Sequence, residues 1–238
     1  KAGRKIREVA YVSLADKFGA PDLTVLAEHI TVGGVIQMAY QQDPQSIIWA
    51  VRTDGTLIGC TYERDIEGNI HAGWHRHTIG GVSDAQGTPA VVESIDTMPS
   101  PDGTRQELWM VVRRRIGGQT VRYVEYLTKF FEDSDLPVNQ FFVDSGLSYS
   151  GAPTTVFGGL WPLEGEAVTV LGDAAPQPDV TVSGGVVTIA TLASVVKIGY
   201  TYNSDGQVLR PEAGAQDGTA LGKTRRTHRI AFLFHRTG

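Results

Sequence analysis

Apolar and polar residues alternate with a period of two along most of the chain, in short runs bounded by Gly, Asp, Asn or Pro. A period of two places successive side chains on opposite faces of a strand, whereas a helix repeats every 3.6 residues. The pattern therefore predicts an all-β protein. Strands are expected in the first half at residues 35–40, 47–52, 57–64, 70–77, 90–98, 107–114 and 120–127.

Turn residues separate these strands. Asp54-Gly55 and Gly117-Gly118 supply the positive φ angles of tight hairpins. Ser100-Pro101-Asp102-Gly103 predicts a turn initiated by proline. Residues 21–30 are the one helix candidate, because Asp22 can cap a segment with apolar residues at helical spacing.

Two tryptophan-bearing hairpins resemble each other, with equivalent tryptophans 60 positions apart at Trp49 and Trp109. Propeller blades are such units, and each must stack on a neighbour to bury its faces. Residues 1–131 are therefore expected to form an incomplete set of β-propeller-like blades. The alternative is that any two tryptophan-bearing hairpins look alike.

The acidic, proline-terminated segment 132–137 predicts a linker. Residues 138–238 are expected to form a small β-barrel or sandwich domain. Its strands are expected at 140–143, 154–157, 167–171, 180–182, 186–190, 195–201 and 228–235.

Composition limits the functions open to the chain. Its 238 residues carry a formal net charge of −5, which argues against a protein built to wrap DNA. Cys60 is the only cysteine, which excludes an intrachain disulfide and a cysteine zinc site. No apolar run is long enough to span a bilayer. The chain begins without Met and stops after an apolar run, so we expect a fragment of a longer protein.

Several longer motifs are similar to a signature of phage and prophage tail proteins. They are residues 48–57, 61–65, 72–77, 99–109 and 121–127. The second half, from Tyr149 through 169–173 and 198–200, resembles the small β domain named after the first catalytic cysteine half-domain of ubiquitin-activating enzymes. No cysteine follows Cys60 to form a thioester, so this second resemblance implies a fold and no catalytic residue.

The resemblance implies a structural protein of the tail tube or nozzle of a short-tailed bacteriophage. Such a protein is made in the bacterial cytoplasm, joins the virion tail as a homo-oligomeric ring with other tail proteins, and can line a channel for DNA passage. No enzymatic activity, catalytic residue, cofactor or metal is expected. The alternatives are a tail adhesin that binds host surface glycans and, less favoured, a tail-associated glycan hydrolase.

Few residue clusters point to chemistry. His71, His75 and His77 lie two or four apart on an expected strand, so their imidazoles would share one face, although a metal site needs further ligands. Glycan cleavage would need two carboxylates facing each other, and the acidic residues here fall in expected turns, as ordinary solvated acids do. They are Glu63, Asp65, Glu67, Glu132, Asp133 and Asp135.

Basic and aromatic residues carry the remaining hypotheses. Residues 113–115 and 223–226 are the basic clusters, which can contact DNA phosphates or an acidic neighbour, or lie at solvated strand ends. The glycine pairs at 80–81, 158–159 and 184–185 lack a P-loop sequence and are interpreted as turns. Trp49 and Trp109 are expected in the core, and Trp161 is the candidate for ligand contact.

Overall fold

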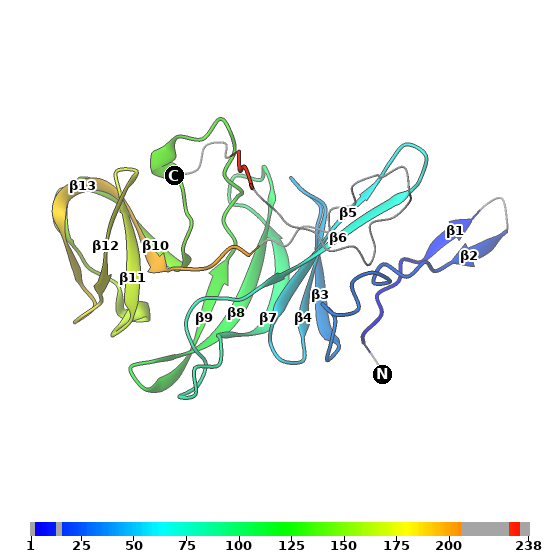
Figure 1. Ribbon diagram of the computed structural model, residues 1–238, viewed down its shortest axis with the longest axis horizontal. Coiled ribbons are helices and arrows are strands. Elements are labelled where there is room, and N and C mark those ends of the chain that lie inside the picture. The colour runs from blue at the N-terminus through cyan, green and yellow to red at the C-terminus, as the bar shows by residue number, and fades with distance from the viewer. Residues whose placement is uncertain (1–2, 13–15, 206–228, 234–238) are drawn as a thin grey trace. The chain divides into compact units, whose positions relative to one another are not determined.

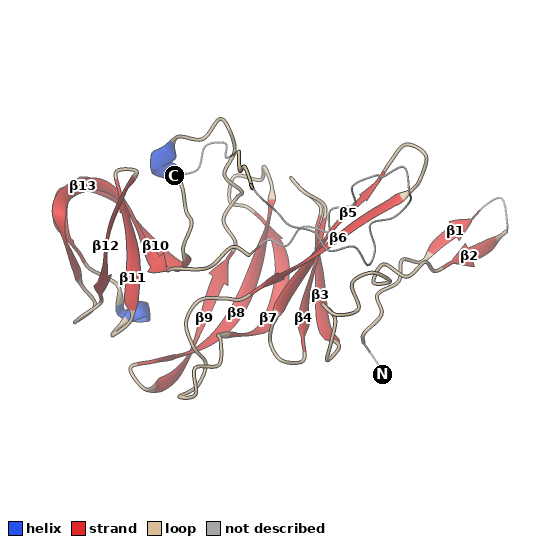
Figure 2. Cartoon of the chain, viewed as in Figure 1, coloured by secondary structure: helices blue, strands red, loops and turns tan. Residues whose placement is uncertain are grey.

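The computed structural model describes residues 3–12, 16–205 and 229–233. Its described strands form four antiparallel sheets, none closed into a barrel, which confirms the all-β prediction (Figures 1 and 2). Lys1–Tyr202 is one compact unit and Asn203–Gly238 a second. The expected strand at 228–235 falls partly outside the described residues, and 229–233 contain no strand.

The first large sheet is a meander of strands in sequence order. It comprises β3 (Val35–Gln41), β4 (Ile47–Arg52), β5 (Leu57–Arg64) and β6 (Ile70–His77), close to the expected bounds. The expected turn joins β4 to β5, where the Gly55 N–H donates to the Arg52 carbonyl at 2.9 Å and Gly55 has φ +79°. An L side chain rarely adopts that φ, so the Asp-Gly pair fixes this hairpin.

The second sheet is a three-stranded meander. It comprises β7 (Val91–Pro99), β8 (Gln106–Ile116) and β9 (Gln119–Tyr126), in the order β7-β8-β9. The proline-initiated turn forms between β7 and β8, where the Gly103 N–H donates to the Ser100 carbonyl at 2.9 Å. The sequence pattern therefore located both meanders and their turns.

These two sheets pack face to face and share one core. One face of β4 and one face of β8 supply most of it, so their alternating side chains interdigitate. The buried core residues are Ile47, Trp49, Val51, Leu57, Ile79, Ala90, Val92, Ile95, Leu108, Met110 and Val112. The Gln37 amide ties β3 to β7, since it donates to the Ile95 carbonyl at 2.6 Å and accepts from the Ile95 N–H at 3.1 Å.

Residues 21–30 form successive turns, so the helix prediction is wrong. The Ala27 N–H donates to Thr24 O and the Ile30 N–H to Ala27 O, both at 2.9 Å, which are i→i+3 bonds. Asp22 does act as a cap, accepting from the Thr24 N–H at 2.9 Å. A short helix gains little beyond its costly nucleus. Here Ala27 and Ile30 instead pack on Ala50 of the first sheet.

A separate two-stranded hairpin precedes these turns. It comprises β1 (Ala10–Val12) and β2 (Lys17–Gly19), and Tyr11 opposes Phe18. The two rings contact edge to face with centroids 5.5 Å apart, yet both side chains are exposed. Isolated two-stranded hairpins are marginal in water.

The C-terminal sheet has the order β10-β13-β11-β12. Its strands are β10 (Asp144–Phe157), β11 (Ala167–Gly172), β12 (Ala175–Thr181) and β13 (Val187–Tyr200). Bulges interrupt the β10–β13 pairing and so bend these long strands.

Some expected strand bounds in this region are wrong. The expected strand at 140–143 is absent, because the chain there follows a short 3-10 helix, Pro137–Asn139, and has no ladder partner until β10. The short strand expected at 154–157 is only the end of β10, and those at 186–190 and 195–201 merge into β13.

The C-terminal sheet has its own core, which shares no residue with the first. Its buried members are Phe157, Leu160, Leu163, Val168, Val170, Val182, Val187, Ile189, Ala193, Val196, Ile198 and Tyr200. The division into domains at 132–137 stays a prediction.

Candidate functional site

A buried charged cluster joins the C-terminal sheet to the second sheet. Arg114 on β8 is fully buried and forms a bidentate ion pair with Glu125 of β9, in which the second contact measures 3.1 Å. Its Nε donates to the Gly80 carbonyl at 2.7 Å, and its guanidinium lies 5.7 Å from the centre of the Tyr200 ring. Charge-assisted bidentate bonds of this kind are strong and directional.

The start of β10 completes the cluster. Asp144 accepts from the Gly80 N–H and Ser145 Oγ donates to Glu125, both at 2.8 Å. Burial raises the pKa of Asp144 above its usual range, while Gly80 and Arg114 act against the rise. Burial also raises the pKa of Tyr200, assisted by the charge of Glu166.

This cluster is suited to joining elements rather than to reacting with a substrate. Arg114 is inaccessible, and its guanidinium is occupied by protein partners. Gly80 is required by the packing, because a Cβ there would lie 2.7 Å from the Tyr200 Cβ and 2.9 Å from that of Asp144. Sequence reasoning placed Gly80 in a simple turn and Arg114 at a solvated strand end, and missed both roles.

The histidines do not gather into a trio. His75 Nδ1 and His77 Nε2 are 2.7 Å apart, and both rings contact Trp49. His71 instead contacts Asp65 at 3.4 Å. In the part of the chain that the structure describes, no group of three or more His, Cys, Asp or Glu is arranged to hold a metal ion. Burial lowers the pKa of both His75 and His77, that of His77 to about 4 with the charge of His75 contributing.

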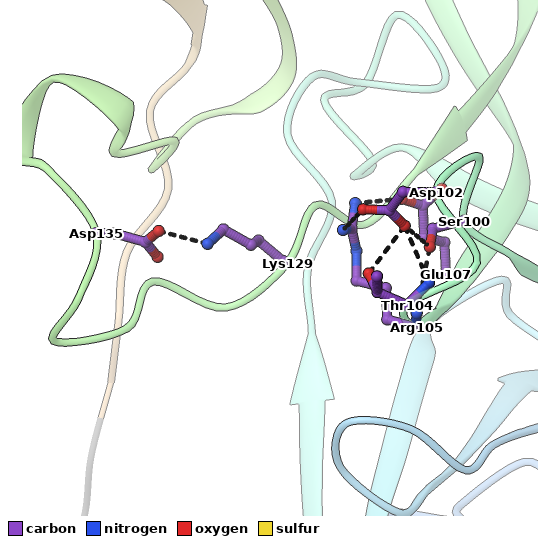
Figure 3. Close-up of polar contacts among 7 residues, drawn as sticks. All are labelled: Ser100, Asp102, Thr104, Arg105, Glu107, Lys129 and Asp135. Carbon is purple, nitrogen blue, oxygen red and sulfur yellow. Dashed lines mark hydrogen bonds and ion pairs between the residues drawn. The ribbon is translucent and has the colours of Figure 1, made fainter.

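Two of the acidic residues expected in turns, Asp65 and Asp135, have local structural partners, whereas Glu63 lies on β5 and not in a turn. Asp65 accepts from the Asn69 N–H at 2.8 Å, which closes the β5–β6 turn. Asp135 forms an ion pair with Lys129 (Figure 3) and accepts from the Glu132 N–H at 2.9 Å. These contacts are typical of turn chemistry.

Figure 3 also shows the β7–β8 turn, where Asp102 receives hydrogen bonds from Ser100 and Thr104. These bonds lower the pKa of Asp102 to about 2. Arg105 donates to Glu107 at 2.6 Å and so attaches the end of this turn to β8.

The basic run 113–115 is divided between two faces of β8. Arg114 points to the core side, whereas Arg113 pairs with Glu93 at 2.9 Å on the other face, where Arg122 also contacts Glu93 at 2.7 Å. The cluster is therefore no uniform basic surface. The second basic segment, 223–226, lies outside the described residues.

The four tryptophans differ in their surroundings. Trp49 is buried in the shared core, as predicted, and its indole N–H donates to Gln41 at 2.8 Å. Trp109 is not in that core and lies on the opposite face of β8, where its ring stacks on Tyr126 at 5.0 Å between centroids. Trp161 is exposed, and its ring covers Gly185. Trp74 packs beneath the 21–30 turns and donates to Leu23 O at 2.8 Å.

In the part of the chain that the structure describes, two apolar faces carry exposed side chains, one on each outer side of the two-sheet core. The β9 face consists of Trp109, Val111, Val124 and Tyr126, whose side chains point away from the core. Val124 is 68% exposed and Tyr126 47%, whereas Trp109 and Val111 are half-buried. The β3 face consists of Ile36, Met38 and Tyr40, which are 60%, 55% and 48% exposed.

A groove of about 380 Å³ adjoins the β3 face. Met38, Tyr40, Ile48 and Tyr62 line it from the sheet, and Ile6 and Leu23 are among the N-terminal residues on its other side. Rows of exposed apolar side chains of this kind mark interaction surfaces. We regard the β3 and β9 faces as the candidate functional site.

Comparison of the chain with protein-family models and with curated proteins finds no match. Among the residues the structure covers, no helix is long and apolar enough to cross a membrane.

Proposed function

We propose that this protein is a structural component of a bacteriophage tail, of the tail tube or nozzle type, and that it acts by assembly with copies of itself and with other tail proteins. In this proposal it is made in the bacterial cytoplasm and resides in the virion, where DNA passes through the ring it helps to form. It has no catalytic role.

The observation that supports assembly most directly is the pair of uncovered apolar faces. A soluble monomer rarely leaves aromatic and aliphatic side chains exposed on two sides of one core, because each costs free energy in water. The motifs that resemble tail proteins are the reason to propose that this assembly is a phage tail. They include Trp109 and most of β9, which belong to the β9 face, and do not include β3.

Electron microscopy of virions labelled with an antibody to this chain tests the proposal. The expected result is label at the tail, with the same number of copies in each particle. Label confined to the capsid, or virions that lack the chain, would refute the tail assignment.

Glycan binding is the second candidate, and the aromatic pair on the β9 face favours it. Aromatic rings at a surface can stack on the apolar faces of sugars, and Tyr126 is half exposed beside Trp109. Titration of the full chain with host surface polysaccharide tests this function, with Tyr126→Ala expected to weaken binding. Leu26→Ala is the control, because Leu26 is exposed on the 21–30 turns and belongs to neither face. Equal binding by all three proteins would exclude this site.

A further inference from the structure

The two sheets of the first core repeat one arrangement, with equivalent faces pointing the same way. Trp49 lies opposite Ala39 and Gly59, and Trp109 lies opposite Asp96 and Tyr126. Trp49 faces the second sheet, whereas Trp109 faces away from the first. Sheets related in this way stack front to back, as successive blades do.

One sheet-to-sheet contact of this kind therefore forms within the chain. The two surfaces that would make a second such contact lie on the outer sides of the two sheets. The Trp49 side of the first sheet is covered by Leu108, Met110 and Val112 of the second. Among the described residues, no second sheet packs on the corresponding Trp109 side of the second sheet, which is the β9 face, and Val124 and Tyr126 stay exposed there. Sixty positions before Leu108 and Met110 stand Ile48 and Ala50, on the outer side of the first sheet.

That outer side is covered only in part. The turns at 21–30 pack on Ala50 and Ile58, which leaves the β3 face and its groove open. The chain therefore has two surfaces of matching kind. The outer side of the first sheet, with the β3 face, is equivalent to the surface that covers Trp49, and the β9 face is equivalent to the Trp49 side.

We infer that a second copy of this chain covers the β9 face with its own β3 face, so that the stacking of sheets within one chain continues between chains. The contact is head to tail, because the two faces differ and lie on opposite sides of one core. A head-to-tail contact closes into a ring or continues as a filament according to its rotation. This inference rests on the proposed function, since it names the surface through which assembly occurs.

Charged side chains lie only at the edge of the β9 face. The Glu93–Arg113–Arg122 group lies at one end of it and is internally paired, so it can form a polar rim around the apolar centre. Val124 is the most exposed member of the β9 face and Met38 is the central residue of the β3 face.

Light scattering and sedimentation of the full chain test the inference with two variants. Val124→Glu places a charge on the β9 face, and Met38→Glu places one on the β3 face. Each is expected to weaken self-association at least about tenfold, because the interface would have to bury an unpaired charge. Leu26→Glu, at an exposed apolar residue outside both faces, should associate as the parent chain does.

Mixing the two variants distinguishes a head-to-tail contact from a symmetric one. Met38→Glu keeps an intact β9 face and Val124→Glu keeps an intact β3 face, so the mixture should form a one-to-one complex and stop there. If only one variant lost association, the contact would join like faces and the inference would be wrong. If neither did, or if the mixture stayed monomeric, it would also be wrong.

The inference is also wrong if the parent chain is monomeric at every accessible concentration. That result is expected if a glycan or the chain's own C-terminal segment occupies the β9 face. The tail assignment would survive that result if the antibody label still lay at the tail. Melting curves identify a variant that fails to fold. Val124→Thr then replaces Val124→Glu, because threonine suits a strand but removes apolar contact.

Discussion

Replacing Arg114 by Met tests whether the buried charged cluster holds the C-terminal sheet to the second sheet. Methionine keeps much of the length of the side chain but removes the guanidinium. The change leaves Glu125 and the Gly80 carbonyl without the charged donor that now contacts both. Loss of one partner from a buried ion pair costs about 3–5 kcal/mol, since the other charge stays buried.

The lower end of that range applies here. Glu125 retains 18% of its side-chain exposure and keeps the hydrogen bond from Ser145, so part of its charge stays solvated. We expect a loss of about 3 kcal/mol in the free energy of unfolding. For a chain of this length, that corresponds to a fall of about 6–12 °C in Tm.

The measurement is a thermal melt followed by circular dichroism and calorimetry. Because Arg114 and Glu125 contact Gly80, Tyr200 and Ser145, the variant should also separate one transition into two. A double variant that adds Glu125→Gln should recover part of the loss, since position 125 then carries no unpaired charge, and only part, because Asp144 still lacks the nearby guanidinium.

Arg115→Met is the matched control, because Arg115 is the next residue and lies on the opposite face of β8. Its effect should stay within about 0.5 kcal/mol. If Arg114→Met melted within that same margin, the cluster would not hold the C-terminal sheet to the second sheet. A large loss without any recovery in the double variant would also contradict the ion-pair explanation.

Three further changes test packing, titration and turn geometry. Gly59→Ala should destabilise the first sheet by about 1–3 kcal/mol in urea unfolding, because a Cβ there would lie 2.2 Å from the His75 ring. Gly73→Ala is the control and should cost far less in the same assay, because a Cβ there meets nothing within 4 Å. The pKa of His77 is lowered to about 4 in the fold, so the unfolded chain binds more protons between pH 6.5 and 4. The free energy of unfolding should therefore fall by up to about 3 kcal/mol as the pH drops through that window, and His77→Gln should flatten the dependence. The Asp173 carboxylate accepts hydrogen bonds from two backbone N–H groups of β13. Asp173→Ala should therefore cost about 1–3 kcal/mol in the same assay, and Asp173→Asn less. Equal losses would contradict the role of the carboxylate.

The sequence by itself determined the strands of the first two sheets and their turns. Alternation of apolar and polar residues needs only local geometry, because successive side chains of a strand point to opposite sides. Asp54-Gly55 and Ser100-Pro101 likewise fix a turn through the φ angles they allow. Local patterns failed at 21–30, where helical spacing of apolar residues was satisfied equally well by turns that pack on the first sheet.

Only the tertiary structure decided which face of each strand is buried. β8 carries large side chains on both faces, Trp109 on one and Met110 on the other, so its sequence is compatible with either direction. The choice depends on contacts with strands far away in the chain. The burial of Arg114, which shares one face of β8 with Val112 and Ile116, depends on such contacts as well. The candidate site follows from that choice, because the faces left uncovered are known only after the covered ones have been found.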